Sequence, residues 1–157
     1  MSNNAIFHLK ERDFYSCQKG EIIMDFKKDL VSTILPFWLK CIDYDNGGIF
    51  TCADREGNIY GTDKSVWFQC EAMIALRMAH DIFGEDKYLD AYNALKKLCE
   101  ECFVDAQCGE WYGYLHYDNT PSTTLKGNIF KGPFHIPRFY MIMSAMDDGD
   151  VMKYFNV

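Results

Sequence analysis

A largely apolar stretch from Ser65 to Phe83 constrains the fold of this 157-residue chain more than any other feature. At helical spacing its apolar side chains point in almost every direction, and Glu71, Arg77 and His80 are the chief interruptions. A helix that is apolar nearly all round must be covered by other elements on several sides. The sequence therefore predicts a helix over 65–83 that is buried on several sides.

Helical periodicity predicts three more helices around it. Residues 21–41 form one apolar stripe that Pro36 is expected to kink; the stripe consists of Ile22, Phe26, Leu30, Ile34, Trp38 and Cys41. After a break at Gly84, a second amphipathic helix carries Tyr88, Tyr92, Leu95, Cys99 and Cys102. Pro137 suits the first turn of a last helix that runs to about Met146.

Short β-elements are predicted between these helices. Residues 49–52 and 58–60 flank the turn-like run 54–57, which is typical of a β-hairpin. The stretch "CGEWYGYLHYDNTP" also has β character, and a Pro/Ser/Thr loop ends it. The expected fold class is all-α, with helical hairpins and short β-hairpins at one end.

Composition narrows the classes of partner and compartment. The chain is 48% hydrophobic and 16% aromatic, as expected of a packed domain, and its net charge is −7. An acidic chain is poorly suited to nucleic acid or to an anionic membrane surface. The start "MSNNAIFHLKERDF" has charges where a signal peptide needs an apolar run, and no stretch reaches membrane-spanning length. We therefore expect a cytoplasmic protein with reduced cysteines, and no membrane or nucleic-acid partner.

Two groups of side chains raise the question of a binding site without settling it. Cys99, Cys102 and Cys108 have part of a zinc-ligand spacing, but no second paired motif follows, so core cysteines are favoured and no metal is expected. Aromatic side chains could stack on sugar rings or fill the core; they are Trp67, Trp111, Tyr112 and Tyr114. Asp43, Asp45 and Asp54 are most simply turn residues.

A basic cluster surrounds the start of the last helix. The partial positive charge of a helix N-terminus disfavours the imidazolium form of His135, which suits a general base. Arg138, Lys126 and Lys131 are near in sequence and could bind oxyanions or sugar hydroxyls. The alternative is a helix-capping histidine beside solvated lysines, which composition alone favours.

Glu71 is the second residue with two interpretations. A carboxylate inside an apolar helix is costly unless it is paired or used. It is either a functional group or one member of a buried pair with Arg77 or His80.

Two blocks of the sequence resemble the N-acylglucosamine 2-epimerase family. "LPFWLKCIDYDNGGIFTCADREGNIYGTDKSVWFQ" is similar to its opening segment, and "CEAMIALRMAHDIFG", "DAQCGEWYGYL" and "KGNIFKGPFHIPR" are similar to its closing segment. Members of this family are more than twice as long and fold as an (α/α)6 barrel. The resemblance implies one truncated domain over 1–157, a partial (α/α)6 barrel whose two ends are fused near 67–71. The run from Trp67 to Glu71 begins like the opening segment of the family and ends like its closing segment.

The resemblance also implies roles for particular residues. His135 matches one of the family's two catalytic histidines, and Glu71 and Arg138 match pocket residues. The second histidine belongs to a Gly-His-x-x-Glu-Trp motif that this sequence lacks. Lys126, Lys131, Trp67 and Trp111 are further candidates for binding the substrate. The family uses a nucleotide as an activator and no redox cofactor, and no nucleotide site can be placed on this chain.

The implied reaction removes the C2 proton of an open-chain N-acylhexosamine, N-acetylglucosamine or N-acetylmannosamine, and returns it on the opposite face. With one of two acid–base groups missing, the expected activity is weak or lost, because such groups act as a unit. The alternative is a non-catalytic remnant that binds a sugar or a protein. Missing barrel helices would leave apolar faces exposed, so we expect a homo-oligomer or a complementing chain to cover them.

Overall fold

The computed structural model describes residues 30–129 and 131–149. These residues fall into two units divided between Phe37 and Trp38, and only a short helical segment of the first unit is described. A π-helical turn, Leu30–Ile34, leads into α2, Leu35–Lys40, so the end of the helix expected over 21–41 is confirmed. Ile22 and Phe26, which complete its predicted stripe, lie outside the described residues.

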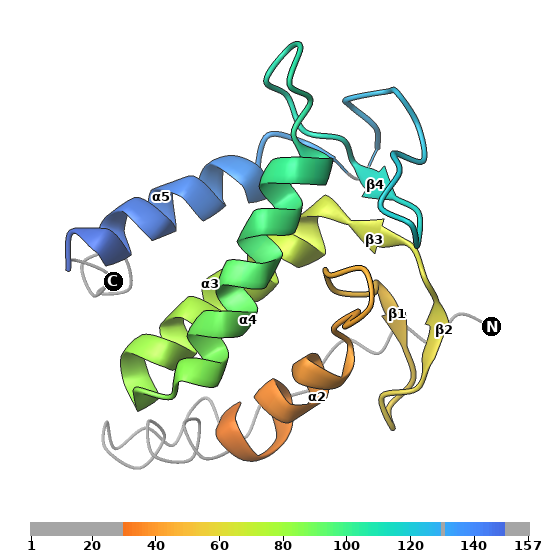
Figure 1. Cartoon of the computed structure of the whole chain (residues 1–157). Coiled ribbons are helices and arrows are strands. Elements are labelled where there is room, and N and C mark those ends of the chain that lie inside the picture. Colours follow the sequence, from red (N-terminus) through yellow and green to blue (C-terminus); the bar gives the residue numbers. More distant parts are fainter. Residues whose placement is uncertain (1–29, 130, 150–157) are drawn as a thin grey trace, which may run out of the picture. The chain divides into compact units, whose positions relative to one another are not determined.

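The second unit contains three long helices (Figure 1). They are α3, Val66–Phe83; α4, Asp86–Leu98; and α5, His135–Asp147. A π-helical turn, Cys99–Phe103, extends α4 to the cysteines that were predicted to belong to it. The four strands are only two or three residues long: β1, Cys52–Ala53; β2, Ile59–Gly61; β3, Lys64–Ser65; and β4, Tyr114–Leu115. The chain is helix-rich with small β-elements, as the sequence predicts.

Helix α3 is buried on several sides, as its composition predicts. Its buried side chains are Val66, Gln69, Cys70, Ala72, Met73, Ile74, Leu76 and Ala79, which point in most directions around the helix. It packs mainly against α4, which lies beside it, and also against α5 (Figure 1). The helix ends at Gly84, which adopts the left-handed conformation at φ 70° and donates its N–H to the carbonyl of His80.

The first hairpin forms where the change of periodicity predicts it. Strands β1 and β2 pair antiparallel, and the carboxylate of Asp54 accepts the backbone N–H groups of Glu56 and Asn58 in the turn between them. Asp43 likewise accepts the N–H groups of Asp45 and Asn46. The turn roles predicted for Asp43 and Asp54 are therefore confirmed.

The second strand pair, β3 with β4, is not evident in the sequence. It pairs Lys64 with Leu115 and Ser65 with Tyr114, so the chain after α4 returns to the N-terminal end of α3. This pairing brings the loop that precedes α5 to the same end of the unit. No helix in the described part of the chain is long and apolar enough to cross a membrane.

Two buried polar contacts hold the loop 43–49 against this end of α3. The side-chain amide of Gln69 donates to the carbonyl of Ile49 and accepts the N–H of the same residue, both at 2.8 Å. The fully buried ammonium of Lys64 lies 2.8 Å from the carboxylate of Asp43. The side chains of Gln69, Lys64 and Asp43 thereby each gain a polar partner.

Candidate functional site

Glu71, His135 and Arg138 meet where the N-terminal part of α3 packs against the first turn of α5. Glu71 Oε1 lies 2.9 Å from His135 Nδ1 and 2.6 Å from an NH1 group of Arg138, which also bonds the other carboxylate oxygen. We call these three residues the Glu71 cluster. The sequence predicts each residue as a candidate, and the structure brings all three together.

The local sequence explains how His135 and Arg138 come to face the same carboxylate. Residues three apart on a helix lie on the same face, so one first turn of α5 presents both side chains to α3. The helix begins at His135, two residues earlier than the start expected at Pro137. His135 is thus the first residue of the helix rather than a residue that precedes it. It does not cap the helix, because no side-chain cap is formed and its ring nitrogen faces Glu71.

The contact with Glu71 fixes which ring nitrogen of His135 is free. A carboxylate only accepts hydrogen bonds, so Nδ1 carries the proton that points at Glu71. In the neutral ring this leaves a lone pair on Nε2, which can accept a proton from a ligand. The cluster therefore has the parts of an oriented general base: an imidazole, a carboxylate that holds it, and a guanidinium that neutralises the carboxylate.

The cluster is open to solvent on one side and bordered by aromatic rings. The side chains of His135, Glu71 and Arg138 are 30%, 26% and 34% exposed. The ring centroid of Trp67 lies 5.5 Å from that of His135. The ring of Phe134 stands edge-on to the imidazole of His135, with 4.9 Å between their centroids. An open group with aromatic neighbours is accessible to a small ligand such as a sugar.

Trp111, the other tryptophan predicted to contact substrate, lies elsewhere in the fold. It is 5% exposed and packs edge-on against Tyr140. Its environment is that of a core residue, the alternative that the sequence leaves open.

The two candidate lysines face a different set of partners. Lys126 lies 2.6 Å from Asp105 and stands over the ring of Tyr112, whereas Lys131 lies 3.0 Å from Glu110. Hydrogen bonds from Lys126, the thiol of Cys108 and a backbone N–H hold the pKa of Asp105 well below its usual range. Both lysines are therefore paired with carboxylates of the 105–110 segment, and within the described residues neither forms a hydrogen bond or ion pair with the Glu71 cluster.

Sequence reasoning missed Asp105 and Glu110 as partners of these lysines. The signal available was the β character of residues 108–121, which predicts a strand in this segment but not which loop it meets. The buried pair proposed between Glu71 and Arg77 or His80 is wrong. Arg77 instead pairs with Asp81, four residues on along α3, and with Asp147 at the end of α5.

The cysteines divide between core and surface. Cys99 is buried, and burial raises its pKa, whereas Cys108 is exposed and donates its thiol hydrogen to Asp105. Cys102, which lies between these two in the sequence, is half-buried. In the ranges 30–129 and 131–149, no three His, Cys, Asp or Glu side chains are grouped so as to hold a metal ion.

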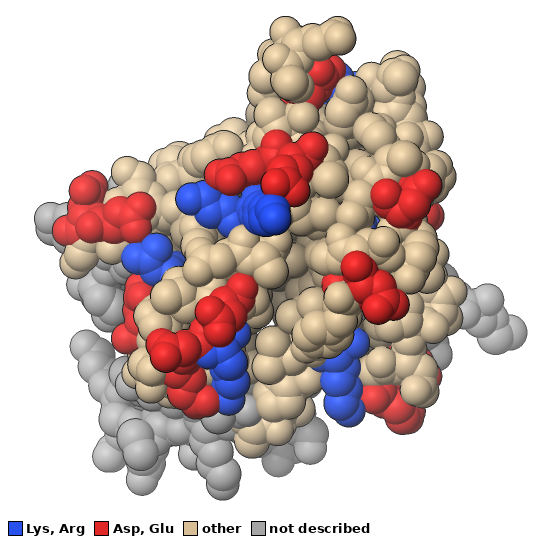
Figure 2. Space-filling view, viewed as in Figure 1, with Lys and Arg blue, Asp and Glu red and all other residues tan. Residues whose placement is uncertain are grey.

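Basic residues do not form a continuous patch on the face shown in Figure 2. Lys and Arg side chains there stand beside Asp and Glu side chains. Pairing of this kind leaves little unopposed positive charge on that face for a polyanion.

Comparison with known proteins links this arrangement to sugar epimerases. The family model described as N-acylglucosamine 2-epimerase (GlcNAc 2-epimerase) matches residues 6–135. The N-acylglucosamine 2-epimerase of Bos taurus is 32% identical over 139 residues, which are 84% of this chain and 32% of that protein. The cellobiose 2-epimerase of Bacteroides fragilis is 26% identical over 132 residues, 83% of this chain and 33% of that protein. The chain thus spans about a third of the length of these relatives.

Solved structures give the same relationship for the fold. A D-mannose isomerase superimposes with a TM-score of 0.63 and 22% identity, over 69% of this chain and 28% of the other. The cellobiose 2-epimerase from Bacillus thermoamylovorans B4167 gives 0.59 and 27% identity, over 64% and 26%. The fold of about two thirds of this chain is therefore one that occurs within larger sugar isomerases and epimerases.

Proposed function

This chain belongs to the N-acylglucosamine 2-epimerase family, and from that membership we propose that its Glu71 cluster removes the C2 proton of an open-chain N-acylhexosamine. The substrates proposed are N-acetylglucosamine and N-acetylmannosamine. The observation that carries the proposal is the 2.9 Å contact between Glu71 and Nδ1 of His135, which leaves Nε2 as the base.

The reaction needs a base and a group that stabilises the enolate. The proton α to an aldehyde is weakly acidic, and removing it places negative charge on the carbonyl oxygen. Arg138 has guanidinium hydrogens beyond those directed at Glu71 and is 34% exposed, so it can donate to that oxygen. The shared carboxylate of Glu71 keeps the base and the guanidinium side by side.

We propose that the whole chain is one truncated domain, a partial (α/α)6 barrel with its seam near 67–71. In support, α3 runs without a break through Trp67 and Glu71, so one helix carries both residues. The proposal has a chemical consequence. Epimerisation needs groups on opposite faces of the enolate, and the motif that would supply the second histidine is missing from the sequence. We therefore expect proton exchange at C2 to be more efficient than epimerisation.

A non-catalytic role in binding is the second candidate. It is favoured by the absence from this sequence of the Gly-His-x-x-Glu-Trp motif that would supply the second histidine. It is also favoured by large apolar side chains that are exposed on α5 and on the loop before it, namely Ile129, Phe134, Tyr140 and Met141. Such a surface suits a second chain, either another copy or a complementing one.

The proposal places the protein in the cytoplasm, where its cysteines stay reduced.

Loss of the C2 proton signal of N-acetylmannosamine in D₂O, followed by proton NMR, tests the catalytic proposal. We expect wild type to exchange this proton and His135→Ala to be slower by about a hundredfold. His116→Ala is the matched control, because its imidazole is exposed and lies beside Asp63 rather than Glu71. Equal rates in wild type and His135→Ala would refute the assignment and leave the binding role.

A further inference from the structure

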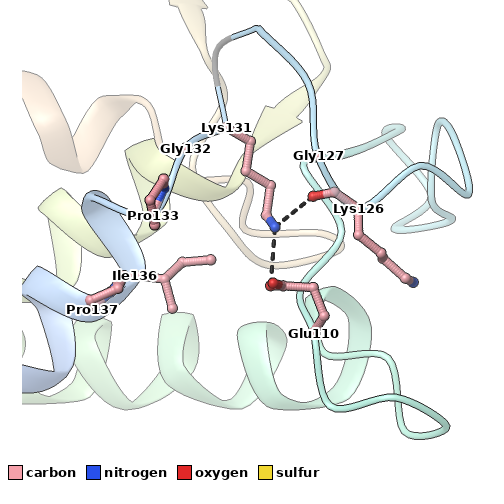
Figure 3. Close-up of a pocket in the computed structure, with 8 residues that line it drawn as sticks. All are labelled: Glu110, Lys126, Gly127, Lys131, Gly132, Pro133, Ile136 and Pro137. Atoms are coloured by element: carbon pink, nitrogen blue, oxygen red, sulfur yellow. Dashed lines mark hydrogen bonds and ion pairs between the residues drawn. The ribbon is translucent and has the colours of Figure 1, made fainter.

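A cavity of about 330 Å³ lies between the loop that precedes α5 and the first turn of that helix. Its lining is drawn in Figure 3 and consists of Glu110, Lys126, Gly127, Lys131, Gly132, Pro133, Ile136 and Pro137. The volume is at the lower end of the range of about 300–1,000 Å³ that is usual for small-molecule sites. It is large enough for a single sugar ring.

A charge pair on the wall of the cavity has hydrogen-bonding capacity to spare. The side chain of Lys131 is only 9% exposed, and its ammonium donates to Glu110 Oε1 at 3.0 Å and to the carbonyl of Lys126 at 2.6 Å (Figure 3). An ammonium has three hydrogens, and the described residues supply no recorded acceptor for the third. A donor nine-tenths removed from water therefore remains for a ligand.

Glu110 supplies an acceptor beside this donor. Its Oε1 takes the N–H of Trp111 at 2.7 Å as well as the Lys131 ammonium, and no donor to Oε2 is recorded among the described residues. The Trp111 N–H first, and then Lys131, hold the pKa of this carboxyl below its usual range. The carboxylate is therefore ionised at neutral pH and accepts hydrogen bonds.

The rest of the lining suits the carbon face of a ring. Pro133, Ile136 and Pro137 supply apolar surface opposite the charge pair (Figure 3). A Cβ added at Gly127 or Gly132 would meet no atom within 4 Å, so both glycines border open space rather than packed protein.

The charge balance selects against an anion. Within the cavity the ammonium of Lys131 is matched by Glu110, and the side chain of Lys126 points away from the pair toward Asp105 (Figure 3). A phosphate would meet the Glu110 carboxylate, and like charges repel. A ligand with neutral groups that both donate and accept hydrogen bonds meets no such penalty.

We propose that this cavity binds an uncharged sugar ring through two neighbouring hydroxyl groups, one accepting from Lys131 and one donating to Glu110. The site is separate from the Glu71 cluster. Ile136 and Pro137 follow His135 directly, so at about 100° per residue they point to other sides of α5 than its imidazole. The inference concerns binding alone and does not need proton transfer at His135.

Titration with methyl β-D-glucopyranoside, followed by the amide signals of Gly127 and Gly132 in NMR spectra, tests this site. The probe cannot open to an aldehyde, so it cannot undergo the C2 chemistry proposed for His135. We expect saturable shifts of both signals in wild type and equally in His135→Ala. Failure of the proposed function would leave this result unchanged. Absence of shifts in wild type would overturn the inference.

Charge variants identify the groups that bind. Glu110→Gln and Lys131→Met should each weaken binding about tenfold, the loss usual for one hydrogen bond to a charged group. The matched controls are Glu101→Gln and Lys97→Met, because these two residues form an exposed pair that does not line the cavity. Unchanged affinity in the cavity variants, or shifts produced by inorganic phosphate at lower concentration than by the sugar, would overturn the proposal.

A cavity-filling variant covers the case in which a charge variant fails to fold. Gly132→Leu adds a side chain toward open space and leaves both charges in place. It should unfold at the same urea concentration as wild type and abolish the sugar-induced shift of Gly127. Retained binding in this folded variant would show that the sugar sits elsewhere.

Discussion

At the scale of single residues, one carboxylate determines what the candidate site can do. Glu71 holds the imidazole of His135 and the guanidinium of Arg138 together, although it is 64 residues away from the first. The sequence, through its family resemblance, predicts all three residues. It does not predict their mutual contact, because helix spacing says which residues share a helix face and nothing about which helices pack together.

Replacing Glu71 by Gln should disturb this arrangement while keeping a side chain of nearly the same size. An amide has one oxygen to offer the two donors, the Nδ1–H of His135 and the guanidinium of Arg138, so we expect a loss of about 1 kcal/mol in the free energy of unfolding. The fixed tautomer of His135 should also be lost, because Nδ1 no longer faces an obligate acceptor.

Nitrogen NMR of the His135 ring measures the tautomer directly, and Glu100→Gln is the control. Glu100 is exposed, and its ion pair with Lys96 is long at 3.9 Å. Its variant should therefore leave the His135 spectrum and the free energy of unfolding unchanged. An unaltered tautomer in Glu71→Gln would contradict the positioning role of the carboxylate.

The Asp105–Lys126 pair predicts a pH dependence with a definite sign. Hydrogen bonds from Lys126, Cys108 and a backbone N–H depress the pKa of Asp105 below its ordinary value of 3.8. A depressed carboxyl pKa stabilises the fold above the unfolded-state pKa, and this stabilisation is lost as pH falls toward the folded-state value.

Lys126→Met tests that linkage by urea unfolding at several pH values. We expect the variant to be less stable than wild type at pH 6, and the difference to shrink as the pH is lowered below about 4. A difference independent of pH over this range would show that Lys126 contributes through its packing on Tyr112 rather than through Asp105.

At the scale of elements, the sequence predicts what is local and misses what is distant. The end of α3 follows from Gly84, which readily adopts the left-handed conformation, and the start of α5 follows from Pro137 to within two residues. The first hairpin follows from the turn at Asp54. The pairing of β3 with β4 joins two-residue strands fifty residues apart, and strands this short have no periodicity to detect.

Gln69 is a structural residue that the sequence does not reveal as such. Its buried amide makes reciprocal hydrogen bonds with the backbone of Ile49. Gln69→Leu keeps the apolar bulk but leaves the N–H and carbonyl of Ile49 unpaired, which should cost about 2–3 kcal/mol of unfolding free energy.

Urea unfolding measures this loss, and Gln107→Leu is the matched control because that residue is exposed in the turn after Asp105. The control should change stability by less than about 0.5 kcal/mol. Equal effects of the two substitutions would mean that the hydrogen bonds between Gln69 and Ile49 add no stability beyond the surrounding packing.

At the scale of the whole molecule, the chain combines a well-packed centre with a surface that retains large apolar side chains. Ile129 is 90% exposed and Phe134 61%, and both lie shortly before His135 in the sequence. We predict that the purified protein forms an oligomer that covers them. Light scattering measures its mass, and Phe134→Ser should shift the distribution toward monomer. A monodisperse wild-type monomer would contradict this expectation.

The central claim is that the Glu71 cluster is one half of an epimerase site, a base that serves one face of the sugar. Proton NMR of N-acetylmannosamine in D₂O measures two rates at once: loss of the C2 proton signal and appearance of N-acetylglucosamine. A lone base returns deuterium to the face that it deprotonated. The account therefore predicts that C2 exchange with retained configuration is at least about ten times faster than epimerisation. Epimerisation as fast as exchange, or no exchange above the His135→Ala level, would contradict it.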